Sequence, residues 1–245
     1  MLSKEKIEKL LLGVDVSVYK NIDSTNTEAK RRAREGKKMP LLICAEGQSA
    51  GRGRLGRSFY SPEGTGLYMS LAFASKAEMA EAVTVTSAAA VAMAEAIEEL
   101  CNVNCRIKWV NDIYAGSRKV CGILAEAVTC GEQNIIVVGI GVNCTTEIFP
   151  DDIKSRAGSI GKVDRNLLAA SIARRLLKYA EKPGDRSWLE FYRSRSMILG
   201  ENITYTENGF TKNAKAIDID RNGGLVICEN GEIKTLSTGE ISVRL

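Results

Sequence analysis

The sequence predicts an α+β protein: a mixed or antiparallel sheet packed against helices, followed by a small β domain at the C-terminus. The chain has 245 residues, of which 44% are hydrophobic and 26% charged, which suits one domain of ordinary size with a small appendage. Strand-like and helical patterns mix as far as residue 196, and only short strand-like runs follow. We therefore expect two domains, at residues 1–196 and 197–245.

Five helices are expected in the first domain, from apolar residues at helical spacing. Thr25 and Glu28 have capping-box spacing at the start of the second helix, and Asp164 can cap the fourth. The third helix is rich in alanine, which is typical of a buried helix. The expected ranges are 3–12, from 23–26 onward, about 79–100, 164–177 and about 185–195.

Short apolar or alternating runs predict the strands. Those of the first domain are expected at 14–19, 41–45, 67–73, 106–109, 113–115, 120–127 and 134–142. Five more, at 202–206, 212–219, 225–228, 233–236 and 241–243, suggest a small barrel. Asn222-Gly223-Gly224 and Asn230-Gly231 have the composition of hairpin turns between them.

The composition excludes several kinds of chemistry. There is no histidine, so Ser-His-Asp and Cys-His nucleophiles and His-based zinc sites are absent. The net charge of +4 favours anionic small molecules but is too small for a dedicated nucleic-acid binder. Seven cysteines without a Cys-x-x-Cys pair indicate buried thiols in a reducing cytosol. A charged N-terminus and the lack of a long apolar run predict a cytoplasmic protein without membrane contact.

The first motif that can carry chemistry is the Gly-Arg loop, residues 51–57, in which three arginines alternate with glycines. Glycines let backbone amides approach a ligand, and arginines suit carboxylates and phosphates. The spacing is not that of a Walker loop. A solvated loop or an RGG-like nucleic-acid tail are the alternatives. Because clustered arginines repel one another, we expect the loop to be mobile when empty and to close over its ligand.

Three further motifs follow along the chain. In the segment 108–112, Asp112 could hold Mg²⁺ and Asn111 could pair with a base edge, although Asn-Asp is also ordinary turn chemistry. Lys119, at the start of the segment 118–124, either protects a sheet edge or projects into a cleft. The alternating glycines of 138–143 leave one strand face open to a flat ligand, unless they serve sheet packing alone.

In this order the motifs resemble those of the bacterial biotin–protein ligases, the biotin–acetyl-CoA-carboxylase ligases. The matching segments are Asp23-Ser24-Thr25-Asn26, Gln48-x-x-Gly-Arg-Gly-Arg-x-Gly-Arg, Lys-Trp-x-Asn-Asp, Arg-Lys-x-x-Gly-Ile-Leu and Gly-x-Gly-x-Asn. The resemblance covers essentially the whole chain. It implies a class II synthetase-like catalytic domain and an SH3-like C-terminal barrel.

The resemblance implies a reaction in two steps. Biotin and MgATP form biotinyl-5′-AMP and pyrophosphate, and a lysine of a biotin carboxyl carrier domain then takes the biotinyl group. Lys119, Arg54 and Asp112 would be catalytic, with Asp112 on the magnesium side. Biotin would contact Ser24, Thr25, Asn26, Gln48, Arg52, Gly53, Arg54 and Lys119. The nucleotide would contact Arg54, Arg57, Phe59, Lys108, Asn111 and Asn143.

Two positions depart from the commonest family pattern: Val110 stands where many relatives have proline, and Phe59 where many have tryptophan. Only about twenty residues precede the first motif, too few for a helix-turn-helix domain, so we expect no DNA-binding function. Family habit and exposed strand edges suggest a homodimer. Two alternatives remain: a lipoate–protein ligase, and a non-catalytic regulator that binds a ligand or nucleic acid.

Overall fold

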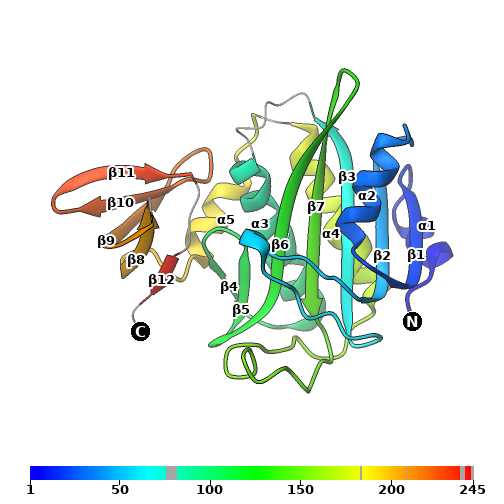
Figure 1. The fold of residues 1–245 in the computed structure, drawn as a ribbon, viewed down its shortest axis with the longest axis horizontal. Helices are drawn as coiled ribbons and strands as arrows, with labels where there is room; N and C mark the ends of the chain where they lie inside the picture. The colour runs from blue at the N-terminus through cyan, green and yellow to red at the C-terminus, as the bar shows by residue number, and fades with distance from the viewer. Residues whose placement is uncertain (76–81, 183, 208, 238–240, 244–245) are drawn as a thin grey trace.

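Two sheets organise the chain in the computed structural model, which describes residues 1–75, 82–182, 184–207, 209–237 and 241–243 (Figure 1). The large sheet has the strand order β1-β2-β3-β7-β6-β5-β4, and the small one β11-β10-β9-β8-β12. The helices are α1 (Lys4–Leu10), α2 (Thr25–Arg34), α3 (Ala82–Cys101), α4 (Arg165–Glu181) and α5 (Trp188–Arg195), with a 3₁₀ turn at Arg54–Gly56. The strands are β1 (Asp15–Ile22), β2 (Leu41–Gln48), β3 (Gly66–Ser75), β4 (Cys105–Lys108), β5 (Asp112–Ala115), β6 (Arg118–Cys130), β7 (Gln133–Asn143), β8 (Asn202–Glu207), β9 (Phe210–Ile219), β10 (Leu225–Glu229), β11 (Glu232–Leu236) and β12 (Ile241–Val243).

The large sheet is buried on both faces near its centre. Strand β1 pairs parallel with β2, and the other pairs are antiparallel. Because side chains alternate along a strand, Leu41 and Ile43 of β2 face α2, whereas Leu42 and Cys44 join the core beneath α3 and α4. Figure 1 shows α2 on one side of the sheet and α3 and α4 on the other. This arrangement confirms the predicted α+β fold class, and it explains why β2 reads as a continuous apolar run.

The helix caps agree with the sequence at α4 and differ at α2. Asp164 accepts hydrogen bonds from the backbone of the first turn of α4, as expected. At α2 the N-cap is Ser24, whose Oγ accepts from the backbone N of Thr27. The expected capping box of Thr25 and Glu28 is therefore wrong by one residue. Residues 79–81 of the third expected helix lie outside the described residues.

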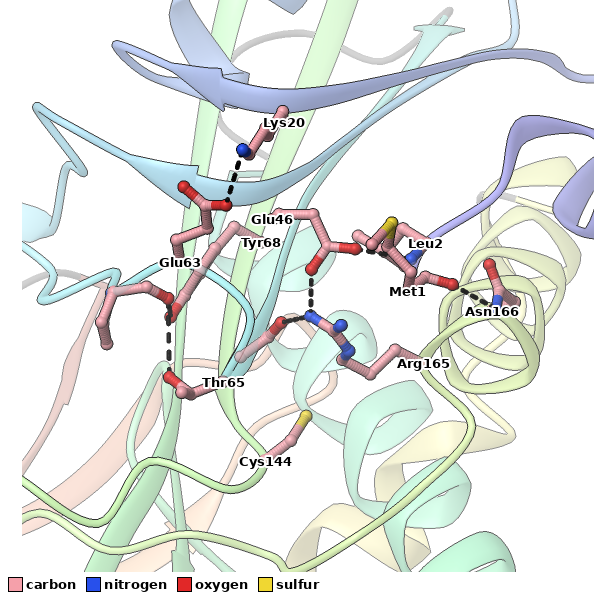
Figure 2. Close-up of polar contacts among 12 residues, drawn as sticks. Met1, Leu2, Lys20, Glu46, Glu63, Thr65, Tyr68, Cys144, Arg165 and Asn166 are labelled. Atoms are coloured by element: carbon pink, nitrogen blue, oxygen red, sulfur yellow. Dashed lines mark hydrogen bonds and ion pairs between the residues drawn. The ribbon is translucent and has the colours of Figure 1, made fainter.

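A buried ion pair anchors the N-terminal segment to the large sheet (Figure 2). Glu46 of β2 accepts a hydrogen bond of 2.6 Å from the backbone N of Leu2 and forms an ion pair of 2.6 Å with Arg165. Arg165, the first residue of α4, also donates to the backbone O of Gly66. Both charged side chains are nearly buried, at 8% and 13% exposed. The pair thus ties together β2, the start of β3, α4 and the N-terminus.

The C-terminal sheet docks against the end of β4 and against α3. The indole N–H of Trp109 donates to the backbone O of Gly223 over 2.8 Å, and this contact is buried. The hydroxyl of Thr84 donates to the backbone O of Asn222. The expected turn at residues 222–224 thus contacts both α3 and the segment that follows β4. The other expected turn is confirmed, because Asn230 and Gly231 take positive φ of 52° and 87° between β10 and β11.

The remaining sequence predictions concern cysteines and membrane contact. All seven cysteines are free thiols, as expected, but four of them are buried, whereas Cys101, Cys130 and Cys228 are partly exposed. Burial raises the pKa of Cys44 to about 12, so this thiol is unreactive at neutral pH. In the part of the chain that the structure describes, no helix is both long and apolar enough to cross a membrane.

Candidate active site

A cleft of about 170 Å³, partly open to solvent, lies where the start of α2, the Gly-Arg loop and strands β5 to β7 meet. Thirteen of the fourteen residues expected to act on ligands line it: Ser24, Thr25, Asn26, Gln48, Arg52, Gly53, Arg54, Arg57, Phe59, Lys108, Asn111, Asp112 and Lys119. Residues spread over almost a hundred positions of the sequence thus converge on one site. The exception is Asn143.

One end of the cleft is a network of neutral hydrogen-bonding groups. The backbone N and the hydroxyl of Thr25 both donate to Gln48 Oε1, at 2.9 and 3.1 Å. Gln48 Nε2 donates to the hydroxyl of Ser61, which in turn donates to the backbone O of Phe59. Ser70 Oγ lies within 2.8 Å of Thr25 Oγ1. Because these groups hold one another in place, the polar end is ordered before a ligand arrives.

The glycines of β6 and β7 serve packing of this chain's own side chains. A Cβ at Gly139 would lie 2.1 Å from Asn26 Oδ1, and one at Gly141 would lie 2.4 Å from the ring of Phe59. The same ring lies against Gly122. The glycines let Asn26 and Phe59 approach the sheet closely enough to form the cleft wall. Gly139 and Gly141 also line the cleft, so the expectation that this strand face meets a flat ligand stays a prediction.

The other end of the cleft is cationic. Lys119 Nζ lies 2.6 Å from Asp112 Oδ1, and the two side chains are 32% and 22% exposed. The backbone of Lys119 is fixed on both sides, because its N donates to the O of Arg156 and its O accepts from the N of Gly158. Strand β6 lies between β5 and β7, so Lys119 does not protect a sheet edge. The structure therefore agrees with the interpretation that the side chain of Lys119 projects into the cleft.

The Gly-Arg loop is a folded-back segment between β2 and β3. Arg52 and Ser58 form an antiparallel bridge, and Gly53 N donates to Arg57 O over 2.7 Å. The interpretation as a disordered tail is therefore wrong. Arg54 Nη1 donates to Asn111 Oδ1 at 3.2 Å, which links the loop to the turn after β4. The loop cations consequently face the same space as Lys119.

Asn143 occupies a different place from the one expected. Its side chain is 6% exposed, and its amide donates to the backbone O of Gly158 over 2.9 Å. Since Gly158 also binds the backbone of Lys119, Asn143 supports the segment that fixes this lysine. Sequence reasoning also missed several residues at the cleft: the lining residues Trp109 and Ile241, and Ser61, which supports the polar end. Ile241 comes from the C-terminal sheet, and no local pattern could have assigned it.

The donor groups suit a magnesium ion that is bound mainly by its substrate. Asp112 is the one carboxylate among the described residues that line the cleft. Within the described ranges no group of three or more acidic, cysteine or histidine side chains could hold a metal alone. Mg²⁺ commonly takes one or two carboxylates together with phosphate oxygens and water. Asp112 therefore fits the role of a single protein ligand to a metal that arrives with a phosphate.

The two ends of the cleft together define what it can bind. The neutral end, with Thr25 and Gln48, suits a head group that both donates and accepts hydrogen bonds. The cationic end, with Lys119, Arg52 and Arg54, suits a carboxylate held against a phosphate, whose mutual repulsion such fixed charges offset. This is the arrangement for joining an acid to a nucleotide without a protein nucleophile.

Known protein families match both parts of the chain. Residues 18–143 match the Biotin/lipoate A/B protein ligase family, and residues 198–244 match the Biotin protein ligase C terminal domain. The chain is 32% identical to the bifunctional ligase/repressor BirA of Escherichia coli (strain K12), over 100% of this chain and 78% of that protein. It is 28% identical to the biotin–[acetyl-CoA-carboxylase] ligase of Mycobacterium tuberculosis, over 92% of this chain and 88% of that protein.

Solved structures agree with these relationships. The structure of a biotin protein ligase from Aquifex aeolicus in complex with biotin and ATP superposes with a TM-score of 0.77 at 28% sequence identity. The match covers 94% of this chain and 98% of that one. The chain therefore belongs to the biotin/lipoate A/B protein ligase family and carries the C-terminal domain of the biotin protein ligases.

Proposed function

We propose that the protein is a biotin–protein ligase. In the first step the biotin carboxylate attacks the α-phosphorus of ATP, so that biotinyl-5′-AMP forms and pyrophosphate leaves. In the second step the ε-amine of a carrier-domain lysine attacks the acyl carbon, an amide bond forms, AMP leaves and the amine loses a proton. The observation that carries the proposal is the single cleft with a neutral hydrogen-bonding end and a cationic end.

The neutral end would bind the head group of biotin. The ureido group of biotin presents two N–H donors and a carbonyl acceptor, which Thr25, Gln48 and the backbone around Ser24 can complement. Asn26 would flank the bicycle, because it lies against Gly139 of β7. The dithiolane ring of lipoate makes no comparable hydrogen bonds. The polar network therefore favours biotin over lipoate.

The cationic end would carry out the adenylation step. Lys119 would lie between the carboxylate and the α-phosphate, with Arg52, Gly53 and Arg54 closing over them from the loop. Bringing two anions together is the main barrier to this step, and cations that are already fixed reduce it without reorganisation. Mg²⁺ bound to the phosphates would neutralise part of their charge. Asp112 would supply its protein ligand while orienting Lys119.

The nucleotide would lie along the far side of the same cleft. Asn111 offers an amide to the adenine edge, and Arg57 and Lys108 offer positive charge to the phosphates. Phe59 supplies an aromatic surface in the position where many relatives have tryptophan. A contact between Asn143 and adenine would require the amide of Asn143 to leave the backbone O of Gly158.

The domain organisation and the partners complete the proposal. Residues 1–196 would form the catalytic domain, and residues 197–245 the C-terminal domain. The acceptor would be the biotin carboxyl carrier domain of acetyl-CoA carboxylase or of a related biotin enzyme. Strand β1 is an outer strand of the large sheet, which supports a homodimer through strand edges.

The proposal is tested by incubating the purified protein with biotin, MgATP and a separately produced carrier domain. Intact-mass spectrometry should detect a single biotinyl group on the carrier, and none when ATP is omitted or when the acceptor lysine is changed to arginine. If the carrier gains no mass while an established biotin ligase modifies the same preparation, the proposed function is wrong.

A further inference from the structure

Glu126 of β6 joins helix α2 to the Gly-Arg loop through one carboxylate. Its Oε2 accepts a hydrogen bond of 2.9 Å from Asn26 Nδ2, and its Oε1 lies 2.7 Å from Lys30 Nζ. Its Oε1 also lies 3.2 Å from Arg52 Nη1 in the Gly-Arg loop. Asn26 and Lys30 belong to α2, whereas Arg52 lies more than twenty positions further along the chain. Glu126 is therefore the point at which the helix and the loop meet.

The environment of Glu126 keeps its carboxylate ionised. Burial alone would raise the pKa of this group, but the hydrogen bonds from Lys30 and Asn26 outweigh burial and lower the pKa below its usual value. The side chain is 20% exposed, and that of Lys30 is 15% exposed. A partly buried, charged acceptor at this position is well suited to hold a loop arginine.

Arg52 is held in a way that leaves most of its donors available. A guanidinium has five N–H donors. Among the described residues, Nη1 is the one nitrogen of this guanidinium with an acceptor. The side chain lines the cleft and is 46% exposed, so the remaining donors can meet an anion while Glu126 keeps its contact.

We propose that Glu126 is a positioning residue for the Gly-Arg loop: its carboxylate sets the distance between Asn26 at the neutral end of the cleft and Arg52 at the cationic end. Glu126 does not touch the reacting atoms. It fixes the position of the loop when the loop closes. That position determines which distance between the head group and the carboxylate of a ligand the cleft can accommodate. The identity of that ligand as biotin depends on the proposed function, but the contact between Glu126 and the loop does not.

The first test needs no ligand, because the loop carries three trypsin cleavage sites. Glu126→Gln keeps the shape of the side chain and an acceptor for Asn26, and removes the charge that holds Arg52. Lys30→Met is the matched control, since it removes the other ion pair of Glu126 without touching the loop. We expect trypsin to cleave the loop of E126Q about fivefold faster than that of the wild type, and the loop of K30M at nearly the wild-type rate.

The same comparison distinguishes positioning from a general effect on stability. Equal cleavage rates for wild type and E126Q would overturn the proposal. So would equal acceleration in E126Q and K30M, because the effect would then come from a loosened α2. Melting temperatures show whether each variant is folded. If E126Q is not, R52Q takes its place: amide hydrogen exchange at 51–57 that is faster in R52Q than in the wild type supports the contact, and equal exchange overturns the proposal.

The second test uses biotin titrations of E126Q, R52Q and the double variant. If Glu126 acts through Arg52, each single change weakens biotin binding about fivefold, and the double variant binds no more weakly than R52Q alone. Additive losses would contradict a shared role. With biotin saturating, the rate of pyrophosphate exchange by E126Q should stay close to that of the wild type, so the defect appears in KM. If the wild type binds no biotin, the proposed function fails while the proteolysis result still decides the role of Glu126.

Discussion

Lys119 and Asp112 form an ion pair of 2.6 Å at the cationic end of the cleft. The lysine comes from β6 and the aspartate from the adjacent strand β5, so the sheet itself sets their separation. The cation is thus oriented before any ligand enters. A fixed charge of this kind stabilises a transition state more than a mobile one, because no reorganisation is needed during the reaction.

Replacing Lys119 should severely impair adenylate formation. For Lys119→Ala we expect biotin-dependent ATP–pyrophosphate exchange to fall by roughly a hundredfold to a thousandfold, the usual cost of one preorganised donor. Lys154→Ala is the matched control, because Lys154 also pairs with an aspartate, Asp151, but on the surface outside the cleft. Exchange by K119A at a rate near that of K154A would rule out the proposed role of Lys119.

Asp112 should affect the magnesium requirement. Asp112→Asn removes one negative charge from the only carboxylate of the described cleft lining, so the half-saturating Mg²⁺ concentration should rise on the order of tenfold. Exchange is measured against Mg²⁺ at fixed, saturating ATP, with Asp151→Asn as the control. A lower rate with an unchanged Mg²⁺ requirement would mean that Asp112 acts only by orienting Lys119.

The stability of α2 should depend on pH through Glu28. Hydrogen bonds from Arg31, and then from Arg32 and Tyr19, lower the pKa of Glu28 from 4.5 to about 2, against the opposing effect of burial. A carboxyl group whose pKa is lowered by folding stabilises the folded protein at pH values above its pKa in the unfolded chain. For Glu28 this contribution is at most about 3 kcal/mol, and it is lost as the pH falls from about 4.5 towards 2. The free energies of unfolding of wild type and Glu28→Gln should therefore differ most at pH 6, approach each other by pH 3 and converge near pH 2.

Urea titrations at several pH values check the Glu28 prediction. Glu147→Gln, an exposed carboxyl in the loop after β7, is the control. A difference between wild type and E28Q that stays constant from pH 6 to pH 3 would show that the ionised carboxylate contributes nothing.

The N-terminal anchor should be a major source of stability. Arg165→Met leaves the Glu46 carboxylate buried without its cation, and removing one partner of a buried pair costs about 3–5 kcal/mol. Glu46→Gln combined with Arg165→Met should recover part of that loss. Urea unfolding measures both, and a loss below about 1 kcal/mol in R165M would mean that the pair contributes no more than a surface ion pair.

The Gly-Arg loop should become more protected when ligands bind. Repulsion among its arginines is offset by Glu126 and Asn111 in the unliganded protein, and a bound carboxylate and phosphate would offset it further. Amide hydrogen exchange of residues 51–57 should therefore slow when biotin and ATP are added together. Exchange that is equally slow without ligand would contradict the closing motion.

The sequence was most informative where local rules decide the structure. Strands and helices follow apolar spacing, and the Asn230-Gly231 turn follows from residues that tolerate positive φ. The cap of α2 was misplaced by one residue because Ser24 and Thr25 offer the same hydroxyl chemistry, and tertiary contacts choose between them. Thr25 instead donates a hydrogen bond to Gln48, the last residue of β2.

The site could be predicted as a list of residues but not as a surface. The glycines of β7 were expected to face a ligand, and besides lining the cleft they pack against Phe59 and Asn26, from segments far away in the sequence. Asn143 was misjudged and Ile241 was missed for the same reason, since only the folded chain brings Gly158 to Asn143 and brings Ile241 of β12 to the cleft. Glu126 could have been noticed in the sequence, because it is a carboxylate within an otherwise apolar stretch of β6.

The most direct test of the account is ATP–pyrophosphate exchange by the wild-type protein with biotin, with lipoate and with neither acid. The account predicts exchange with biotin alone, because the neutral end of the cleft complements the ureido group and the cationic end joins its carboxylate to the α-phosphate. Exchange with lipoate, or no exchange with either acid in a protein that is folded and binds ATP, would contradict it.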